Sequence, residues 1–410
     1  MRMPPRHKDT KNHKELNFND VFLVNLCALA PLWQKKFFLI ITFSLYLLSV
    51  GRAQSGENEW PLFRGRADLS GKYDSDLPSN PQLLWSVSTG SRTKSSPVIS
   101  EGTVYFGNDK GTLTAISTEG KIIWNYESGS AIEAAPMVFG NKVIFGSTDG
   151  ILKAVDKKTG KLLWSYATEN QIAGSSNVWL AGNKAGIVVG SYDFFLHCVD
   201  PGNGKPLWKV ETENYVNGTP AILNGKVIFG GCDGMIRIVD PLTGKQKDSI
   251  DIGVYIAASP ALSTDFAYFG DYDGTIYCVN LLSKKISWKI SGTGESGAVL
   301  AIPAVGNNVV IVGSEDKYLY CYKASDGKLN WKYRTNGRIL GSAVITSDRV
   351  LFPAMDGNIF ILGLADGKKL WSFNAGTPIS SSPAVIKGKF YILTEDGRLL
   401  TFGDKTALKK

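Results

Sequence analysis

Short runs of β-branched and aromatic residues, separated by turn residues, recur through most of the chain. The unit that covers residues 135–164 shows the pattern, with runs at 135–138, 142–146, 151–156 and 159–164. Asp149-Gly150, between the second and third runs, suits a tight hairpin because glycine tolerates a positive φ. The pattern therefore predicts units of four short antiparallel strands, named A to D in chain order.

The fourth run of most units ends in a tryptophan, and these tryptophans recur at near-constant spacing. They are Trp85, Trp124, Trp164, Trp208, Trp288, Trp331 and Trp371. The successive gaps are 39, 40, 44, 80, 43 and 40 residues. The gap of 80 is two periods, in which Asp248 stands where a tryptophan is expected. A period of about 40 residues that carries strand patterns is typical of a β-propeller.

The residue that closes strand B gives the number of units. It is Gly107, Gly146, Gly190, Gly230, Gly270, Gly313, Pro353 and Leu393. The eighth unit lacks a fourth run, whereas residues 83–87 form a run without a unit of their own. We therefore predict an all-β fold, an eight-bladed β-propeller of four-stranded antiparallel blades, closed by this N-terminal outer strand. The propeller is expected at 82–403, after a lead-in at 54–81 and before a tail at 404–410.

The first 53 residues are expected to lie outside the propeller. Lys35 and Lys36 precede an apolar run, 37–50, which ends in a stretch with small residues at 51–53. This order is that of a secretory signal peptide, so we expect export to the periplasm or cell envelope of a bacterium. The run of 14 residues is short for a membrane span, although a signal anchor is an alternative. Residues 1–34 fit a misassigned start.

The charge balance argues against a nucleic-acid partner. The net charge of +8 comes from 45 basic and 37 acidic residues. Residues 1–52 hold eight of the basic and three of the acidic ones, so the remainder has a net charge of only +3. This is not the basic footprint of a nucleic-acid-binding protein.

Two repeat positions have a structural interpretation. In the recurring Gly-Lys-x-x-Trp element, the glycine permits the turn from strand C to strand D, and the tryptophan is expected to lie across the neighbouring blade. A position in strand C carries small residues, namely Ala115, Ala154, Cys198, Cys278 and Cys321. Equivalent positions in different blades lie far apart, so we interpret these cysteines as core residues that form no disulfides.

The segment 154–164, Ala-Val-Asp-Lys-Lys-Thr-Gly-Lys-Leu-Leu-Trp, resembles the tryptophan-docking motif of the pyrroloquinoline-quinone (PQQ) repeat superfamily. The segments 198–208, 321–331 and 361–371 follow it with small changes. The resemblance covers about residues 59–403. It implies one of two branches: quinoprotein dehydrogenases, which hold PQQ and calcium on the propeller axis, or a non-catalytic group that resembles BamB, a scaffold of the outer-membrane β-barrel assembly machine.

Some features depart from these families. Asp248 replaces the tryptophan of the fourth unit, and Lys284 replaces the glycine of the fifth. We predict that the fourth blade, without its tryptophan, opens first. No cysteine stands directly after the apolar run at 37–50, which departs from typical BamB lipoproteins and argues against a lipidated N-terminus.

An enzyme of the quinoprotein type needs a catalytic carboxylate base and oxygen ligands for Ca²⁺. The resemblance to the alcohol-dehydrogenase type also implies two adjacent cysteines, and this sequence has no such pair. Its short units lack the insertions with which those enzymes build a pocket. We therefore expect no cofactor and assign no catalytic, cofactor-binding or metal-binding residue. A PQQ-dependent dehydrogenase with calcium is the alternative.

Other site chemistries find little support. After residue 53 the chain has a single histidine, His197, which argues against a His-based triad or a multi-histidine metal site. A series of aspartates falls in the turns between strands B and C: Asp149, Asp193, Asp233, Asp273, Asp316, Asp356 and Asp396. We interpret them as caps of local backbone N–H groups, which is the usual role of aspartate in turns.

The loops that join strand D to the next strand A vary most between units and should share a face with these aspartates. Arginine and tyrosine are enriched at interface hot spots. We therefore expect partner contact at Arg92, Tyr215, Tyr255 and Arg338. The predicted function is a monomeric, exported, non-catalytic scaffold that binds a protein partner in the cell envelope, in a BamB-like role. Glycan or cell-wall binding is a further alternative, which clustered surface aromatics would favour.

Overall fold

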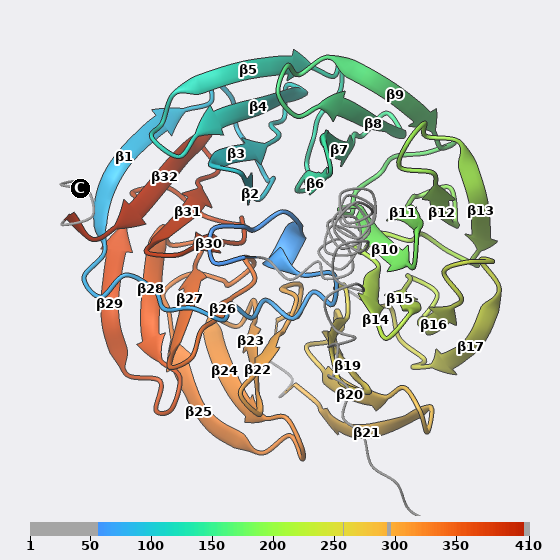
Figure 1. Cartoon of the computed structure of the whole chain (residues 1–410). Coiled ribbons are helices and arrows are strands. Elements are labelled where there is room, and N and C mark those ends of the chain that lie inside the picture. The colour runs from blue at the N-terminus through green and yellow to red at the C-terminus, as the bar shows by residue number, and fades with distance from the viewer. Residues whose placement is uncertain (1–55, 257, 293–296, 406–410) are drawn as a thin grey trace, which may run out of the picture. The chain divides into compact units, whose positions relative to one another are not determined.

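The computed structural model describes residues 56–256, 258–292 and 297–405. These residues form eight sheets of four antiparallel strands, arranged as blades around a central axis (Figure 1). A short 3₁₀ helix, η1 (Phe63–Gly65), lies near that axis. The prediction of an all-β, eight-bladed propeller is therefore confirmed.

The strands follow the order that the repeat predicts. Strands A, nearest the axis, are β2 (Val98–Ser100), β6 (Met137–Phe139), β10 (Asn177–Ala181), β14 (Ala221–Leu223), β18 (Ala261–Ser263), β22 (Ala304–Gly306), β26 (Val344–Ile345) and β30 (Ala384–Ile386). Strands B are β3 (Thr103–Phe106), β7 (Lys142–Gly146), β11 (Lys184–Gly190), β15 (Lys226–Gly230), β19 (Phe266–Gly270), β23 (Val309–Gly313), β27 (Arg349–Pro353) and β31 (Lys389–Leu393). Strands C are β4 (Thr112–Ser117), β8 (Ile151–Asp156), β12 (Phe195–Val199), β16 (Met235–Val239), β20 (Ile276–Asn280), β24 (Tyr318–Lys323), β28 (Asn358–Gly363) and β32 (Arg398–Gly403). Strands D are β5 (Ile122–Glu127), β9 (Leu162–Ala167), β13 (Pro206–Glu211), β17 (Gln246–Asp251), β21 (Lys285–Ile290), β25 (Leu329–Arg334), β29 (Lys369–Asn374) and β1 (Gln82–Ser88).

The outer strand of the eighth blade comes from the N-terminal side of the propeller. β1 pairs with β32 in antiparallel register, from Gln82 opposite Gly403 to Ser88 opposite Arg398. Both ends of the propeller therefore contribute to one sheet, and backbone hydrogen bonds close the ring. The predicted closure by an N-terminal outer strand is confirmed.

The signal-peptide prediction, with its signal-anchor and misassigned-start alternatives, concerns residues 1–53. These residues lie outside the described part of the chain. Among the described residues, no helix has the length and apolar character needed to cross a membrane.

The small residues of strand C face the docking tryptophans across the sheet. Ala115 pairs with Trp124, Cys198 with Trp208, and the register of each pair of strands shifts next to this position. Cys198, Cys278 and Cys321 are buried free thiols. Burial raises the pKa of the Cys198 thiol to about 12, so it is inert at neutral pH.

Six of the docking tryptophans reach into the following blade in the same way. Each indole N–H donates to a carbonyl of the next C–D turn at 2.8–3.2 Å: Trp85 to Thr118, Trp124 to Lys157, Trp164 to Pro201, Trp208 to Pro241, Trp288 to Ala324 and Trp331 to Leu364. Each ring also lies against a glycine of that turn, namely Gly120, Gly160, Gly204, Gly244, Gly327 and Gly367. These glycines have a positive φ, and a Cβ added to any of them would stand 2.6–3.1 Å from the indole. Glycine is thus required both by the backbone and by the tryptophan.

The boundary between blades 4 and 5 is built differently. Asp248 stands at the tryptophan position of blade 4, and Lys284 stands at the glycine position of blade 5, with a φ of 59°. The two side chains meet, because Lys284 Nζ lies 2.5 Å from the Asp248 carboxylate. The two departures from the motif are therefore one feature, an ion pair in place of a tryptophan on a glycine.

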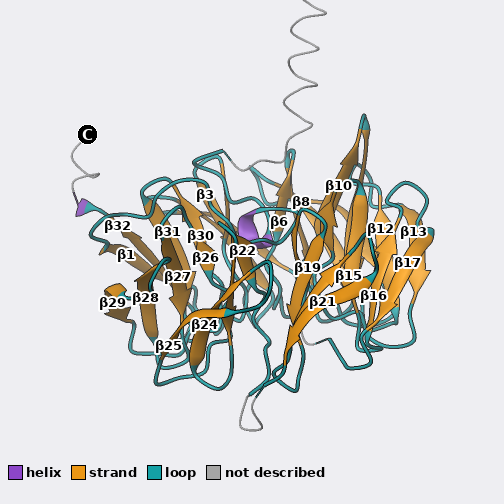
Figure 2. Cartoon of the chain, turned by 90° about the horizontal axis from the view of Figure 1, so that it is seen from below, coloured by secondary structure: helices purple, strands orange, loops and turns teal. Residues whose placement is uncertain are grey.

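The lead-in residues 57–73 run through the centre of the ring and bond to every blade, and we name them the axial plug (Figures 1 and 2). Their carbonyl groups accept hydrogen bonds of 2.6–3.0 Å from the A strands and the residues beside them: Glu57 from Lys387, Trp60 from Ile99, Pro61 from Val138, Ala67 from the Asn177 side chain and from Ile222, Asp68 from Leu262, Ser70 from Val305 and Gly71 from Ile345. The backbone donors and acceptors of the innermost strands thereby find partners. One short segment thus holds all eight blades at the axis.

Arg64 is the buried charge of the axial plug, with 1% of its surface exposed. Its guanidinium donates to the carbonyl of Ala343 at 2.5 Å, of Pro303 at 3.2 Å and of Leu69 at 3.5 Å. Burial lowers the pKa of Arg64 to about 9, while the nearby Asp68 carboxylate acts in the opposite direction. The side chain therefore stays charged at neutral pH, and main-chain carbonyls of blades 6 and 7 solvate it.

Candidate partner-binding face

The D–A loops and the B–C turns lie together at one face of the propeller, which we name the B–C face; the A–B and C–D turns lie at the opposite, C–D face (Figure 2). Backbone hydrogen bonds of 2.8–3.0 Å join the two kinds of loop on the B–C face, as from Asp109 N to Arg92 O, from Cys232 N to Tyr215 O and from Met355 N to Arg338 O. The D–A loops therefore share a face with the aspartate turns, as the sequence predicts.

Two repeat positions on this face vary strongly in side chain, while the backbone contact between them recurs, as from Thr148 N to Ala131 O and from Glu395 N to Pro378 O. The loop position is held by Arg92, Ala131, Gln171, Tyr215, Tyr255, Ala298, Arg338 and Pro378. The turn position is held by Asp109, Thr148, Tyr192, Cys232, Tyr272, Glu315, Met355 and Glu395. All four predicted contact residues occupy the loop position. Side chains can differ here without disturbing the fold, which is how a rigid scaffold acquires a specific surface.

The two predicted arginines bridge neighbouring blades. Arg92 Nη2 lies 3.8 Å from the carboxylate of Glu395, and Arg338 Nη1 lies 2.8 Å from that of Glu315. In both pairs the loop residue reaches back to the turn position of the preceding blade. Exposed pairs of this kind contribute about 0–1 kcal/mol, so they fasten the loops only weakly.

The predicted tyrosines form part of an aromatic group instead. Tyr215 reaches back to the turn position of its preceding blade, where it stacks on Tyr192 with ring centroids 4.5 Å apart. Phe194 lies 5.3 Å from the same ring. On the next loop Tyr255 is 62% exposed, and Tyr272 in the turn of blade 5 is 50% exposed.

The structure thus brings Tyr215 and Tyr255 to neighbouring blade boundaries and places Arg92 and Arg338 elsewhere on the ring. Sequence reasoning missed the other members of the aromatic group. Residues 192, 232 and 272 are spaced by 40, as residues 215 and 255 are, so the register of the repeat could have revealed them.

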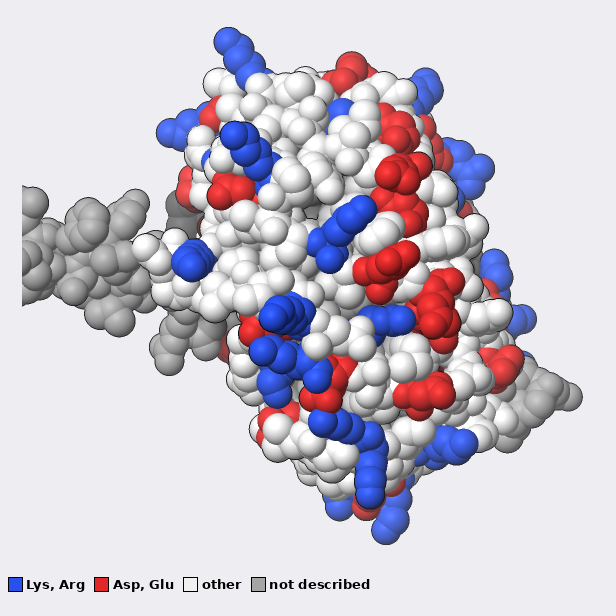
Figure 3. Space-filling model, turned by 90° about the vertical axis from the view of Figure 1, so that its right-hand side faces the viewer, with Lys and Arg blue, Asp and Glu red and all other residues white. Residues whose placement is uncertain are grey.

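Acidic residues gather on this side of the molecule. Figure 3 shows acidic side chains in a column right of the centre of the view, with basic side chains on both sides of it. Exposed carboxylates at or beside the D–A loops of blades 3 to 5 include Glu169, Glu211, Glu213 and Asp251. This part of the B–C face therefore carries a negative potential.

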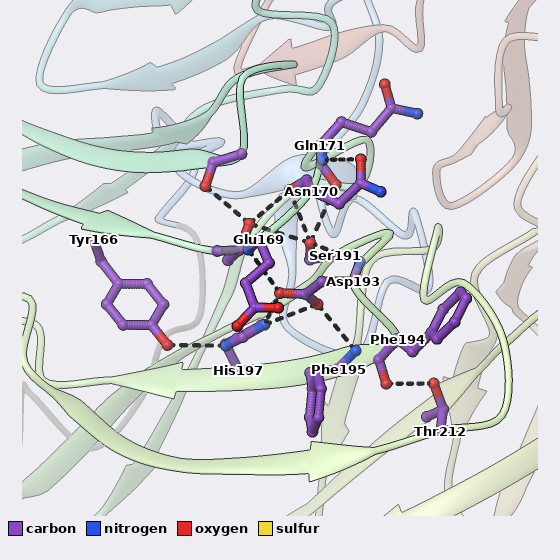
Figure 4. A network of polar contacts seen from close by, with 12 residues as sticks. Tyr166, Glu169, Asn170, Gln171, Ser191, Asp193, Phe194, Phe195, His197 and Thr212 are labelled. Atoms are coloured by element: carbon purple, nitrogen blue, oxygen red, sulfur yellow. Dashed lines mark hydrogen bonds and ion pairs between the residues drawn. The ribbon is translucent and has the colours of Figure 1, made fainter.

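Most aspartates of the B–C turns cap backbone N–H groups, whereas Asp396 accepts from the side chains of Thr394 and Arg398. Asp193 is typical: one oxygen accepts from Phe195 N at 3.1 Å within its own turn, and the other accepts from Glu169 N at 3.0 Å in the preceding loop (Figure 4). Asp233 and Asp356 make the same two contacts in their blades. Each aspartate thereby joins a turn to the end of the previous D strand.

Asp193 also pairs with the single histidine of the propeller (Figure 4). His197 Nε2 lies 3.0–3.1 Å from both Asp193 oxygens, and its Nδ1 lies 2.9 Å from the Tyr166 hydroxyl. A proton on Nε2 satisfies the carboxylate and leaves Nδ1 to accept from the tyrosine. Burial lowers the pKa of His197, and the Asp193 carboxylate offsets this only in part. Lys153 and Arg237 hold the same position in blades 2 and 4, which favours a structural role for this network.

The His197 environment predicts a pH dependence of stability. In the unfolded chain a histidine titrates near 6.5, and in the folded chain the pKa of His197 is lower. Between these values only the unfolded chain binds the proton, so the free energy of unfolding falls as pH is lowered from 7.5 to 5. His197→Gln, which keeps a donor and an acceptor, should reduce this fall in urea titrations at the two pH values. An unchanged fall in the variant would assign the effect to carboxylates instead.

An axial cavity of about 230 Å³ lies above Phe63 of the axial plug, on the side of the B–C face. Residues of all eight blades line it, and seven of them carry hydroxyls: Ser96, Ser175, Thr219, Ser259, Ser342, Ser380 and Ser382. Backbone N–H groups donate to the hydroxyl of the next blade at 2.7–3.0 Å: Ser175 to Thr219, Thr219 to Ser259, Ile302 to Ser342, Ser342 to Ser382 and Ser382 to Ser96. These hydroxyls therefore fasten blade to blade around the axis.

The lining of this cavity does not fit PQQ and calcium. Its one carboxylate, Glu133, is paired with Lys94 at 2.8 Å, whereas Ca²⁺ takes six to eight oxygen ligands. The volume is also below the range of about 300–1,000 Å³ that is usual for ligand pockets. Within the described ranges, no group of three or more His, Cys, Asp and Glu side chains could hold a metal ion.

A family model described as "Outer membrane protein assembly factor BamB" matches residues 78–290 and 273–407. No curated protein sequence matches the chain significantly. Among solved structures, BamB from Moraxella catarrhalis is 18% identical, with a TM-score of 0.68 over 80% of this chain and 98% of its own.

Enzymes share the fold as well. The quinohemoprotein alcohol dehydrogenase from Comamonas testosteroni is 13% identical, with a TM-score of 0.74 over 84% of this chain and 80% of its own. A europium-containing methanol dehydrogenase is 13% identical, with a TM-score of 0.72 over 86% of this chain and 99% of its own. Likeness at such identities shows the fold alone. By the match along almost the whole propeller, the chain belongs to the PQQ-repeat β-propeller family whose model is that of BamB.

Proposed function

We propose that this chain is an exported, non-catalytic scaffold that binds a protein partner of the bacterial envelope through its B–C face. A BamB-like role in outer-membrane protein assembly is the most concrete form of this function. The observation that carries the proposal is the group of exposed aromatic side chains in blades 3 to 5 of that face, with Tyr215, Tyr255 and Tyr272 at 40–62% exposure. Solvent-exposed aromatic rings that cluster on one face mark a binding surface.

The scaffold is well suited to hold such a surface in place. Docked tryptophans, the hydroxyls around the axis and the axial plug fasten each blade to the next. A surface that is already ordered loses little conformational entropy when a partner binds. In this proposal the chain acts as a monomer and without a cofactor.

Glycan binding is the second candidate, because exposed aromatic rings also suit stacking on sugars. The carboxylates beside the rings, such as Glu211 and Glu213, favour a cationic partner over the anionic polymers of an envelope. We therefore give the protein partner precedence.

In vivo photo-cross-linking tests the proposal directly. A photoreactive phenylalanine analogue in place of Tyr255 should give one discrete protein adduct, which mass spectrometry identifies. The matched control is the same analogue at Asn183, an exposed turn residue of the C–D face. A polysaccharide adduct at position 255, or equal protein adducts at both positions, would refute the proposed surface.

Titration with PQQ and Ca²⁺ should leave the Tm unchanged, and a rise would revive the enzyme alternative.

A further inference from the structure

Five aromatic residues of the B–C face form one surface, which we name the aromatic platform: Tyr192, Phe194, Tyr215, Tyr255 and Tyr272. Among the described residues, the exposed aromatic side chains are four of these five. The other large exposed hydrophobics are aliphatic and lie in C–D turns or strands D, as Ile122 and Leu163 do. The platform is therefore a local feature of blades 3 to 5 and not a product of the repeat.

The platform has two parts, joined by the B–C turn of blade 4. The first is the stack of Tyr192 on Tyr215, flanked by Phe194. The second is a hollow of about 440 Å³ between Tyr255 and Tyr272. This turn joins them, because Cys232 N–H donates to Tyr215 O at 3.0 Å and Gly234 O accepts from the N–H of Ile252, in the loop that carries Tyr255, at 2.9 Å.

Carboxylates lie in the same segments as the platform. Glu211, Glu213 and Asp251 are exposed at the ends of strands D and in the D–A loops that carry Tyr215 and Tyr255, and Asp273 lines the hollow with Tyr255 and Tyr272. Lys209, a cation of the same strand as Glu211, lies over the Phe195 ring with Nζ 4.0 Å from its centroid. The rings and the acidic edge together favour a ligand that is both cationic and able to lie flat on aromatic faces.

We propose that the aromatic platform docks a basic, extended segment of the partner protein, with arginine or lysine side chains over the tyrosine rings and beside the carboxylates. This inference rests on the proposed function and names the chemistry of its partner. Cation–π contacts and charge-assisted hydrogen bonds act on the same side chain here, since guanidinium can stack on a ring and donate to a carboxylate at its edge. An extended segment suits the platform because its two parts lie on successive blade boundaries.

Peptide binding by the purified propeller tests this inference. The probe is a fluorescent 12-residue peptide of alternating arginine and serine, compared with the same peptide carrying citrulline, which keeps the shape but not the charge. We expect fluorescence anisotropy to show binding of the arginine peptide only, and weaker binding at 300 mM than at 50 mM NaCl because the contact is electrostatic. Equal binding of the citrulline peptide would overturn the inference.

Variants then test whether the rings of Tyr215 and Tyr255 are what binds the peptide. Y215S/Y255S should weaken binding of the arginine peptide by about tenfold or more, whereas Y215F/Y255F, which keeps both rings, should bind almost as the native chain does. R92S/R338S, in the same loop position on other blades, is the matched control and should leave binding unchanged. An unchanged Tm in each variant shows that the propeller is intact. Loss of binding in R92S/R338S instead would place the site elsewhere.

The outcome is distinguishable from failure of the proposed function. A protein adduct at position 255 without peptide binding would leave the scaffold proposal standing and refute the basic segment. If the native chain binds a neutral cell-wall oligosaccharide and neither peptide, and Y215S/Y255S loses that binding, the inference is overturned in favour of glycan recognition. Neither a protein adduct nor peptide binding would refute both.

Discussion

Replacing Arg64 by methionine is expected to lower the free energy of unfolding by about 3 kcal/mol. The substitution leaves the carbonyls of Leu69, Pro303 and Ala343 without the donor that the guanidinium supplies. Each buried group left without a partner costs about 1–3 kcal/mol, and relief from burying a charge returns part of that cost. Urea denaturation, followed by tryptophan fluorescence, measures the change.

Two variants calibrate the Arg64 result. Arg66→Met removes a neighbouring, less buried arginine that pairs with Asp68 and Asp74, and should cost about 1 kcal/mol or less. Arg64→Lys keeps the charge but replaces a five-donor fork by a single ammonium, so it should fall between the native chain and R64M. A stable R64M variant would mean that burying the charge costs as much as its hydrogen bonds contribute.

Removing a docking tryptophan is expected to have an equally large effect. Trp164 is 7% exposed, and its ring lies on Gly204 while its N–H donates to Pro201 O. Trp164→Ala should therefore cost about 3–5 kcal/mol. At the equivalent position of blade 4, Asp248→Ala removes only a partly exposed ion pair with Lys284 and should cost about 1 kcal/mol or less.

The same difference predicts where the ring opens first. Amide hydrogen exchange should be faster in β17 and β21, beside the ion pair, than in β9 and β13, which a docked tryptophan joins. D248W/K284G should rebuild the tryptophan-on-glycine contact and slow that exchange. D248W alone should not, because the Lys284 side chain occupies the space where the indole ring would lie. Uniform protection of all blades would contradict a weak boundary between blades 4 and 5.

The fold could be predicted from the sequence because the pattern of each of the four strands occurs eight times along the chain. Glycines, turn aspartates and tryptophans recur in register, so the strands assigned in one unit can be transferred to the others. The axial plug could not be predicted in this way, because residues 57–73 occur once and carry no period. The contact between Asp248 and Lys284 was missed for a different reason: the two residues lie 36 positions apart, in separate units, and each looks like an isolated departure from the motif.

The position of the candidate site was predictable, and the repeat register could also have revealed its further members, but the contacts between them could not be predicted. The variable D–A loops identify the B–C face, and Tyr215 and Tyr255 were chosen by residue type. Residue type alone could not show that Arg92 and Arg338 pair with glutamates of preceding blades. It also could not show that Tyr192 stacks on Tyr215, since that contact depends on the curvature of the ring and not on spacing along the chain.

The axial plug and β1 have a consequence for how this molecule comes into being. Both are made before any blade, yet their partners extend to Ile345, Lys387 and Gly403. Neither can settle until nearly the whole polypeptide has been synthesised, and contacts of such long sequence separation form slowly. An unfinished chain therefore lacks both the contacts of the axial plug with the last blades and the pairing of β1 with β32. Slow completion of this kind would suit the export proposed above, because a chain that is translocated after its synthesis has to stay unfolded until then.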